Sequence, residues 1–373
     1  MPPLRVIFSG GGTGGHLFPA IAIADEVRKV EPDADILFVG TQDKIEARVV
    51  PTKGFSFATI WISGFRRSIR LSNILFPLKL IVAMIQARSI IKHFRPDVVV
   101  GTGGYVSGPV LRAAVQARVP TLIQEQNSYP GVTTRLLAKK VNEVHVTFEA
   151  SKKFLSGARQ LFVSGNPTRG DLQGAARDEA MRYFKFDERS TDKTLLIFGG
   201  SLGAHTINEA VVEHLDEFMN RKIRLIWQTG KEDFALVRQR ADNYRGSSCW
   251  IGAFIDRMDL AYAASDLVVC RAGATTIAEI TRLGKPAILV PYPFAAANHQ
   301  VENARAIAAQ GAAVIIDDQR AKSDLLAKVE TLLQSSNLQE MSHRSKALGM
   351  PDAARNIAQR VVALGRMKDR AAA

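Results

Sequence analysis

The chain has 373 residues, of which 46% are hydrophobic and 23% are charged. This composition is ordinary for a globular protein and excludes the disordered and fibrous classes. The length exceeds the size at which one hydrophobic core keeps growing, so two domains are expected. The formal net charge of +13 limits the possible partners to polyanions, phosphorylated ligands and anionic membrane surfaces.

The cysteines and the apolar segments further restrict the class of protein to which this chain can belong. Cys249 and Cys270 have no CxxC spacing, so we expect neither a disulfide framework nor a zinc site, and a reducing cytoplasm fits. The N-terminus lacks the pattern of a secretory signal. The most apolar segment, residues 74–91, is interrupted by a proline, a lysine and an arginine, whereas a membrane-spanning helix needs ~20 apolar residues. We therefore expect no segment that crosses the bilayer.

Short β-branched runs alternate with helical patterns along the whole chain. The runs are continuously apolar, which is typical of strands that helices cover on both faces. Residues 20–30 show the helical pattern, because Ile23, Val27 and Val30 fall on one face. The alternation predicts an α/β fold of two doubly wound, Rossmann-like domains. The predicted strands are 6–8, 36–39, 98–100, 121–123, 144–147 and 161–163 in the first half, and 195–198, 225–227, 267–269, 288–290 and 314–316 in the second.

A polar stretch separates the two halves. We expect an N-terminal domain at 1–165, a linker at 166–193 and a C-terminal domain at 194–373. Each half begins with a strand, a glycine loop and a helix, which is the nearest feature to an internal repeat. Residues 351–368 read as a helix with Pro351 near its first turn, and we expect this helix to pack back on the first domain.

Glycine-rich loops follow several of the predicted strands. They are GGGTGGH at 10–16, GTGGY at 101–105 and GGSLGAH at 199–205. A loop that leads into a helix collects backbone N–H groups at the positive end of the helix dipole, which favours a bound phosphate. Glycines also close turns without binding anything, but the carboxyl ends of parallel strands meet at a ligand crevice. Because neither a dinucleotide fingerprint nor a P-loop is present, the residues alone predict a two-domain protein that binds a phosphorylated ligand.

A series of motifs narrows this interpretation. From the first glycine loop to residue 304 they are GGTGGHLFPA, GTGGYVSGP, EQNSYPG, SGNPTR, GGSLGA, CRAGATTIAE and NHQVENA. Together they closely resemble the MurG family of peptidoglycan glycosyltransferases. The resemblance implies the GT-B architecture, in which two Rossmann-like domains face each other across a cleft and the C-terminal one holds most of the nucleotide sugar.

The activity that the resemblance implies is that of an inverting hexosyltransferase. It moves N-acetylglucosamine from UDP-N-acetylglucosamine to the C4 hydroxyl of the muramyl sugar of lipid I, a lipid-linked muramyl pentapeptide, giving lipid II and UDP. No metal and no other cofactor is implied. The adjacent Asp317 and Asp318 lie beyond the last predicted strand and read as a solvated turn rather than as a metal site.

The resemblance also implies donor contacts. Ser201 is expected at the diphosphate, Ile255 at the uracil through its backbone, and Glu279 at the ribose hydroxyls. Gln300 is expected at the sugar hydroxyls and Arg169 beside the leaving diphosphate. Helix capping, a turn or a solvated charge is the structural alternative for these side chains. The full set expected to contact UDP-N-acetylglucosamine is Thr13, Gly14, Gly15, Asn127, Arg169, Ser201, Ile255, Ala274, Thr275, Thr276, Glu279 and Gln300.

The acceptor hydroxyl must lose its proton, and a histidine with an ordinary pKa of about 6.5 can accept it near neutral pH. His16 is therefore expected as the general base, unless it only caps a helix or packs in its loop. Glu125 is the alternative base, or it orients the acceptor or the histidine. Many family members have a histidine before this glutamate, whereas this chain has Gln124. The acceptor side is assigned to the residues of the second loop, Gly103, Gly104 and Tyr105.

Residues 61–95 combine a dense apolar series with basic side chains, among them Arg66, Arg67 and Arg70. Such a segment can dock on anionic lipid headgroups, as a lipid-linked acceptor requires. A core helix with a solvated basic face has the same pattern. The expected location is peripheral, on the cytoplasmic face of the cell inner membrane, in cell-wall biogenesis and hence in cell shape and division.

Other functions fit part of the pattern. A UDP-N-acetylglucosamine 2-epimerase has the same double-Rossmann scaffold, but it needs neither the segment 61–95 nor GTGGYVSGP. A GT-B transferase that acts on another lipid acceptor is a further alternative. The charge alone fits nucleic-acid binding, but it is not concentrated in a tail and aromatic residues total only 7%, so we expect no nucleic-acid partner.

Overall fold

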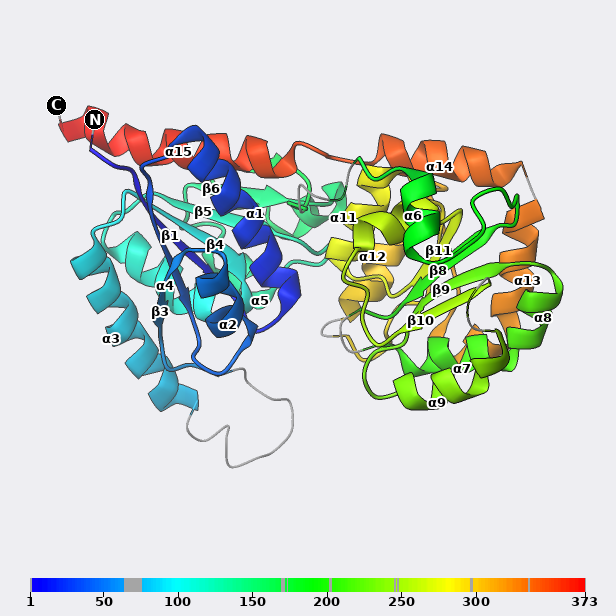
Figure 1. Ribbon diagram of the computed structural model, residues 1–373. Coiled ribbons are helices and arrows are strands. Elements are labelled where there is room, and N and C mark those ends of the chain that lie inside the picture. The colour runs from blue at the N-terminus through cyan, green and yellow to red at the C-terminus, as the bar shows by residue number, and fades with distance from the viewer. Residues whose placement is uncertain are drawn as a thin grey trace. The chain divides into compact units, whose positions relative to one another are not determined.

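The computed structural model describes residues 2–63, 76–168, 172, 174–200, 203–244, 246, 248–295, 298–334 and 336–372. The chain forms two compact units. The first comprises Met1–Arg169 and Met350–Ala373, and the second comprises Gly170–Gly349. Each unit is built on a parallel β-sheet with helices on both faces (Figure 1). This is the doubly wound α/β fold that the alternating pattern predicts.

The sheet of the first unit has the order β3-β2-β1-β4-β5-β6-β7. Neighbouring residues of one strand face opposite helical layers, which explains why the strand sequences are continuously apolar. In β1, Val6 and Phe8 pack towards one layer and Ile7 towards the other. The strands are β1 (Arg5–Gly10), β2 (Asp35–Gly40), β3 (Ser56–Thr59), β4 (Val98–Gly103), β5 (Thr121–Glu125), β6 (Glu143–Val146) and β7 (Leu161–Val163).

Helices cover both faces of this sheet. One layer consists of α1 (Gly14–Val30), α2 (Ile45–Thr52) and α15 (Ala353–Ala372). The other contains α3 (Phe76–Phe94), α4 (Gly104–Gln116) and α5 (Val132–Leu137), and the short 3-10 helix η2 (Glu149–Phe154) follows β6. None of the helices in the described parts of the chain is both long and apolar enough to span a bilayer.

The C-terminal helix α15 is bound to the first unit by ion pairs. Arg360 donates both a bond of 3.1 Å and a shorter one to the buried carboxylate of Glu143, and Arg366 pairs with Glu31 at 2.7 Å. Burial raises the pKa of Glu143, but the hydrogen bonds from His145 and Arg360 outweigh it and leave the pKa below its usual value. These contacts bind α15 to Glu143 in β6 and to Glu31 directly after α1.

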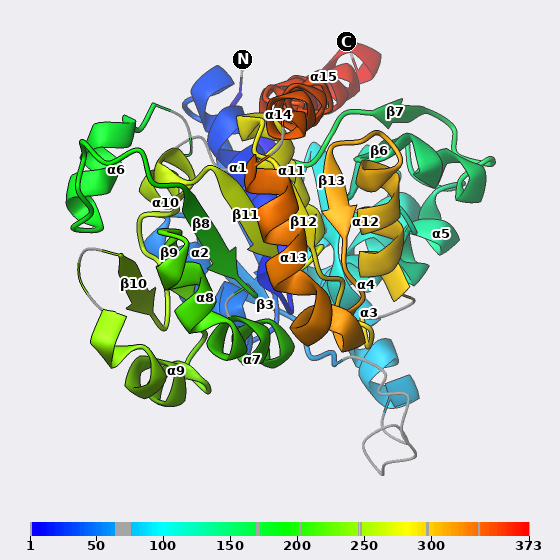
Figure 2. The same cartoon turned by 90° about the vertical axis from the view of Figure 1, so that its right-hand side faces the viewer.

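The sheet of the second unit has the order β10-β9-β8-β11-β12-β13. One face packs on α7 and α13, and Figure 2 shows α13 in front of the strands. On the other face the Phe198 ring meets Tyr262 of α10. The strands are β8 (Thr194–Phe198), β9 (Arg224–Gln228), β10 (Cys249–Gly252), β11 (Leu267–Cys270), β12 (Ala287–Leu289) and β13 (Ala313–Ile315).

The helices of the second unit connect these strands and extend past the sheet. They are α6 (Arg177–Tyr183), α7 (His205–Glu213), α8 (Leu215–Asn220), α9 (Phe234–Arg240), η4 (Asp242–Tyr244), α10 (Met258–Ala264), α11 (Ala274–Leu283), α12 (His299–Ala308), η6 (Asp318–Arg320), α13 (Ala321–Gln334) and α14 (Asn337–Ala347). Helix α6 lies inside the stretch expected as a linker and packs on α10.

Each predicted strand is present, with ends that differ by a few residues. The edge strands β3 and β10 were not predicted; no residue of β3 is fully buried, and in β10 only Cys249 is. The predicted helix at 20–30 is part of α1, in which Ile23, Val27 and Val30 fall on one face. Val30 is the last residue of α1 and is 46% exposed, whereas Ile23 and Val27 are buried.

Candidate functional site

The first-unit site lies where β1, β4 and β5 end, and its central residue is His16 in the first turn of α1. The His16 Nδ1 atom is 2.8 Å from Gln126 Oε1 and 3.1 Å from the Thr102 carbonyl oxygen. The Thr102 hydroxyl donates to the His16 carbonyl at 2.7 Å. The expected base is therefore fixed through its ring and its backbone by residues at the ends of two neighbouring strands.

The glycines between β4 and α4 allow the loops of this site to touch. Gly103 has φ of 105°, and a Cβ added there would lie 2.6 Å from the His16 Nδ1 atom. At Gly104 the φ is 80°, and an added Cβ would lie 2.3 Å from the Gly11 carbonyl oxygen. Both the backbone conformation and the lack of space require glycine here. Tyr105, the next residue, is 54% exposed.

Glu46 holds the first glycine loop, and the sequence interpretation missed it. Its carboxylate is buried and accepts the Gly12 N–H at 2.9 Å, the Thr41 N–H at 3.1 Å and the Thr41 hydroxyl at 2.9 Å. The Gly12 amide is thus bound to a carboxylate of the protein. Thr13, Gly14 and Gly15 continue this loop into α1, and Thr13 and Gly15 are exposed. The signal for Glu46 was weak, because one acidic residue in the helix IEARVVPT reads as a solvated charge.

Glu125 is buried at the end of β5, and both of its carboxylate oxygens accept hydrogen bonds. One oxygen receives the backbone N–H and the side-chain amide of Asn127, at 3.1 and 3.3 Å. The other receives the Gly131 N–H at 2.9 Å and the Thr134 hydroxyl at 2.6 Å. These four donors match the acceptor capacity of a carboxylate. The geometry therefore favours Glu125 as the residue that shapes the turn to α5, and it places the expected donor residue Asn127 in that turn.

In the second unit, Gln228 joins two loops at the end of β9. Its amide donates to the Gly200 carbonyl oxygen at 2.8 Å and accepts the Ile255 N–H at 2.9 Å. Gly200 belongs to the loop between β8 and α7, and Ile255 lies between β10 and α10. Because the Ile255 N–H is engaged, its carbonyl oxygen is the backbone group to consider for a ligand. Gln228 was not predicted as a site residue.

The amino end of α11 carries several expected donor contacts. Gly273 is the N-cap residue and has no side-chain capping bond, so the first amides of Ala274, Thr275 and Thr276 lie at an uncapped end. The Thr275 hydroxyl is buried and has no hydrogen-bond partner among the described residues. Such an end is suited to bind an anion. One turn further, the carboxylate of Glu279 is mostly buried and accepts the Tyr262 hydroxyl at 3.0 Å.

Two further contacts complete the carboxyl end of this sheet. The Gln300 side-chain oxygen accepts the Tyr292 N–H at 2.9 Å, which fixes the first turn of α12. Asp318 forms an ion pair with Arg271 and accepts the Thr206 hydroxyl at 3.2 Å. The interpretation of Asp318 as part of a solvated turn is therefore wrong. Its partner Arg271 directly follows β11, so this pair connects the ends of β11 and β13.

Some expected residues cannot be placed. Arg169 and Ser201, expected at the donor diphosphate, and Arg66, Arg67 and Arg70 of the basic segment lie outside the described residues. Cys249 and Cys270 are buried and form no disulfide bond. Burial, with the nearby charge of Glu279, raises the pKa of the Cys270 thiol. Among the residues that the structure describes, no group of three or more His, Cys, Asp or Glu side chains is arranged to hold a metal ion.

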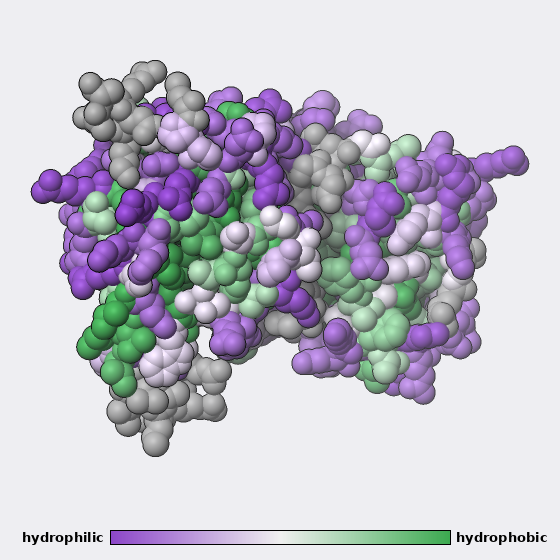
Figure 3. All heavy atoms as spheres, turned by 60° about the vertical axis from the view of Figure 1, so that its left-hand side comes forward, coloured by the Kyte–Doolittle hydropathy of each residue, from purple (hydrophilic) through white to green (hydrophobic). Residues whose placement is uncertain are grey.

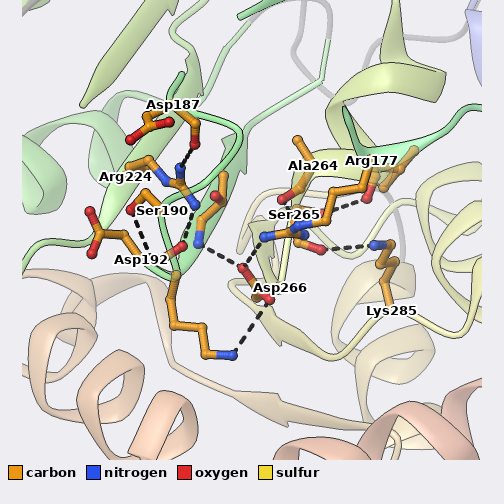
Figure 4. Close-up of polar contacts among 12 residues, drawn as sticks. Arg177, Asp187, Ser190, Asp192, Arg224, Ala264, Ser265, Asp266 and Lys285 are labelled. Atoms are coloured by element: carbon orange, nitrogen blue, oxygen red, sulfur yellow. Dashed lines mark hydrogen bonds and ion pairs between the residues drawn. The ribbon is translucent and has the colours of Figure 1, made fainter. Parts of the chain in front are cut away.

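A separate polar cluster lies at the opposite, amino end of the second sheet (Figure 4). Asp266 accepts the Thr194 N–H at 2.8 Å and pairs with Arg177 at 3.0 Å. Lys285 donates to the Ser265 carbonyl oxygen at 2.8 Å, and burial lowers its pKa to about 8. Ligands of open α/β sheets bind at the carboxyl ends of the strands. We therefore interpret this cluster as part of the fold and not of the site.

Comparison with known proteins identifies the family. The N-terminal and C-terminal domain families of glycosyltransferase family 28 match residues 6–146 and 194–357. A relative from Chlorobaculum parvum, named UDP-N-acetylglucosamine–N-acetylmuramyl-(pentapeptide) pyrophosphoryl-undecaprenol N-acetylglucosamine transferase, is 44% identical over 97% of this chain and 100% of its own.

Two solved structures are also similar. The crystal structure of Acinetobacter baumannii MurG covers 96% of this chain and 99% of its own, with a TM-score of 0.76 and 27% identity. A UDP-GlcNAc 2-epimerase from Neisseria meningitidis, bound to UDP-GlcNAc, has a TM-score of 0.65 and 12% identity over 96% of this chain and 98% of its own, and this likeness shows the fold alone. The two domain families and the full-length relative show that the chain belongs to glycosyltransferase family 28 and, within it, to the MurG family of N-acetylglucosamine transferases.

Proposed function

We propose that this chain is an inverting glycosyltransferase that moves N-acetylglucosamine from UDP-N-acetylglucosamine to the C4 hydroxyl of lipid I, giving lipid II and UDP. The observation that carries the proposal is the 44% identity to a transferase of that name over 97% of this chain and the whole of the relative. The first unit supplies the acceptor side and the base, and the second unit binds the donor.

The second-unit site has groups that suit each part of UDP. The uncapped end of α11 offers amide donors to a phosphate oxygen, with Thr275 as an added hydroxyl donor. The Ile255 carbonyl oxygen is the acceptor for the N3–H of uracil, because the N–H of this residue already binds Gln228. Glu279, held from one side by Tyr262, accepts the ribose hydroxyls. Arg169 and Ser201 stay predicted contacts of the diphosphate.

The reaction needs one proton transfer and one displacement at carbon. His16 Nε2 takes the proton of the acceptor C4 hydroxyl while its oxygen forms a bond to C1 of N-acetylglucosamine. The bond from C1 to the diphosphate oxygen breaks, and UDP leaves with that electron pair. Charge grows on the diphosphate in the transition state, so donors already aimed at it lower the barrier. Glu125 is the weaker base, because four donors of the protein already occupy its carboxylate.

A lipid-linked acceptor requires the enzyme to meet a membrane, and α3 has a suitable surface. Leu78, Ile81 and Ile85 are 51%, 58% and 60% exposed and share one side of the helix, away from its buried Ala83 and Ala87. Figure 3 shows the hydrophobic surface gathered on this part of the first unit. The exposed Arg88 and Lys92 continue the same side of the helix. We propose that this surface of α3 docks on anionic lipid headgroups.

The activity is tested by mixing the protein with labelled UDP-N-acetylglucosamine and a lipid I analogue. Formation of a lipid-linked disaccharide and UDP supports the proposal. Formation of an epimer from the nucleotide sugar without any acceptor would instead identify an epimerase. Transfer to a different lipid acceptor, with none to the lipid I analogue, would identify the other alternative.

Membrane docking is tested with vesicles that contain anionic lipid. The double substitution of Ile81 and Ile85 to glutamate is expected to abolish co-sedimentation, because it places charge in the apolar surface. Leu236→Glu, at a residue of the second unit that is 52% exposed, is the control and should bind normally. Equal binding of both variants would contradict the assignment of this surface.

A further inference from the structure

We propose that Gln126 is a positioning residue that fixes the tautomer of His16, so that Nε2 is the ring nitrogen without a proton. The inference deepens the proposed function, because it concerns the base of that reaction. Gln126 lies directly after β5 and is buried. Its side chain reaches His16, which is more than one hundred residues away in the sequence.

The orientation of the Gln126 amide follows from its neighbours. Its nitrogen faces acceptors: the Thr102 carbonyl oxygen at 2.8 Å, the Gln124 carbonyl oxygen at 3.1 Å and the side-chain oxygen of Gln124. The reverse orientation would place an oxygen against these oxygens in a buried environment, which costs free energy. The Gln126 Oε1 atom must therefore face the imidazole.

The protonation of the ring nitrogens follows in turn. Nδ1 of His16 meets two oxygens, Gln126 Oε1 at 2.8 Å and the Thr102 carbonyl oxygen at 3.1 Å. Both are acceptors, so Nδ1 carries the proton and donates it to them. A neutral imidazole then has its lone pair on Nε2. That atom has no hydrogen-bond partner within the described parts of the chain, which is what a base needs before it binds its substrate.

Gln124 is the next residue in this chain of contacts. Its side-chain oxygen accepts from Gln126, and its amide nitrogen lies 3.4 Å from Asn166 Oδ1. The Gln124 side chain therefore supports the Gln126 amide and is not itself an acid or a base. The series of contacts from His16 through Gln126 to Gln124 contains no charged group until His16 gains a proton in the reaction.

The tautomer is measured directly by nitrogen NMR of the protein labelled at its histidines, with the His16 signals identified by their absence in His16→Ala. In the unaltered protein with a neutral His16 imidazole, we expect the pyridine-like nitrogen at Nε2. A protonated Nε2 would overturn the proposal. In Gln126→Met, which has a similar volume but no amide, we expect an increased population of the other tautomer, because only the Thr102 carbonyl oxygen remains.

Kinetics provide the second measurement. In Gln126→Met we expect kcat to fall about 10-fold with little change in KM. Loss of one neutral hydrogen bond lowers the population of the correctly held imidazole by a factor of roughly 2 to 12, and molecules with the wrong tautomer add to the loss of kcat. Gln116→Met, at an exposed glutamine of α4, is the matched control and should keep its kcat. Thermal unfolding of each variant verifies folding.

A double-variant comparison separates positioning from general damage. If Gln126 acts through His16, Gln126→Met should cost nothing further in the His16→Ala background. An equal loss in both backgrounds would overturn the proposal. Near-full turnover of His16→Ala alone would instead overturn the assignment of His16 as base, and the NMR measurement does not depend on that result.

Discussion

Replacing Gly103 with alanine should move His16 and leave the rest of the first-unit site in place. The added Cβ would lie 2.6 Å from His16 Nδ1 and 2.9 Å from Cε1. Ordinary contact begins near 3.4 Å, so the imidazole has to move by about 0.8 Å. That displacement breaks the alignment of Nδ1 with Gln126 and Thr102. A misplacement of about 1 Å at a reacting group costs roughly 100-fold in rate, so we expect kcat to fall about 10- to 100-fold.

The same substitution also strains the backbone. Gly103 has φ of 105° and ψ of −173°, a region that only glycine enters readily, and a side chain there costs about 1–3 kcal/mol. Activity and stability must therefore be separated. Gly54→Ala is the matched control, because Gly54 has φ of 70° and its added Cβ would meet nothing within 4 Å. We expect Gly54→Ala to lose about 1–2 kcal/mol of stability and to keep its kcat.

The assay is kcat for transfer to a lipid I analogue at saturating substrate, measured beside urea unfolding of both variants. A Gly103→Ala enzyme with the same kcat as the Gly54→Ala control would refute the reasoning. In that case the imidazole position in this structure would not be the one that sets the rate.

Further predictions concern buried charges. Burial lowers the pKa of Lys285 from 10.5 to about 8, so between these pH values only the unfolded chain holds the proton and the folded protein gains about 3 kcal/mol of stability as the pH rises. Lys285→Met should lack this gain, which urea unfolding measured against pH detects. Arg360→Met should destabilise the protein by about 2–3 kcal/mol at pH 7, since it leaves the buried Glu143 carboxylate without its cation. The pKa of Glu143 is lowered in the folded chain, so in the unaltered protein this stabilisation is present at neutral pH and declines as the pH falls through that pKa, and Arg360→Met should show a smaller decline. Glu46→Gln should cost about 1–3 kcal/mol, because an amide nitrogen would face the Gly12 or Thr41 donors; thermal unfolding measures this loss.

The sequence predicts most of the fold because its signal is local. Continuous apolar runs identify the central strands, where residues such as Val6, Ile7 and Phe8 are fully buried. The edge strand β3 lacks this signal, since its sequence SFAT has a polar residue at each end and no buried residue, whereas the short apolar run at 249–251 in β10 was overlooked. The apolar pattern of α1 continues to Val30, which is the last residue of that helix and is 46% exposed.

The candidate site was predicted only in part, because its contacts depend on tertiary structure. His16 was identified from its place after a glycine loop, and its partners Thr102 and Gln126 become visible only when β1, β4 and β5 lie side by side. Glu46 is a comparable case, since a buried carboxylate in an amphipathic helix has the same sequence pattern as a solvated one. The glycines of the loops were predicted to leave room for a bound ligand, but at Gly103 the His16 side chain occupies the space that a Cβ would need.

The amide at position 124 has a consequence for the pH dependence of the enzyme. Gln124 and Gln126 do not titrate, so neither side chain adds a proton to the acid side of the kcat/KM profile. Gln124→His places a titratable group against Gln126. When that imidazole is charged it no longer accepts from the Gln126 amide, so the support of His16 weakens on the same side of the profile. We expect the acid limb of Gln124→His to be steeper than that of the unaltered enzyme. An unchanged slope with unchanged kcat would show that the contact between Gln124 and Gln126 does not influence the base.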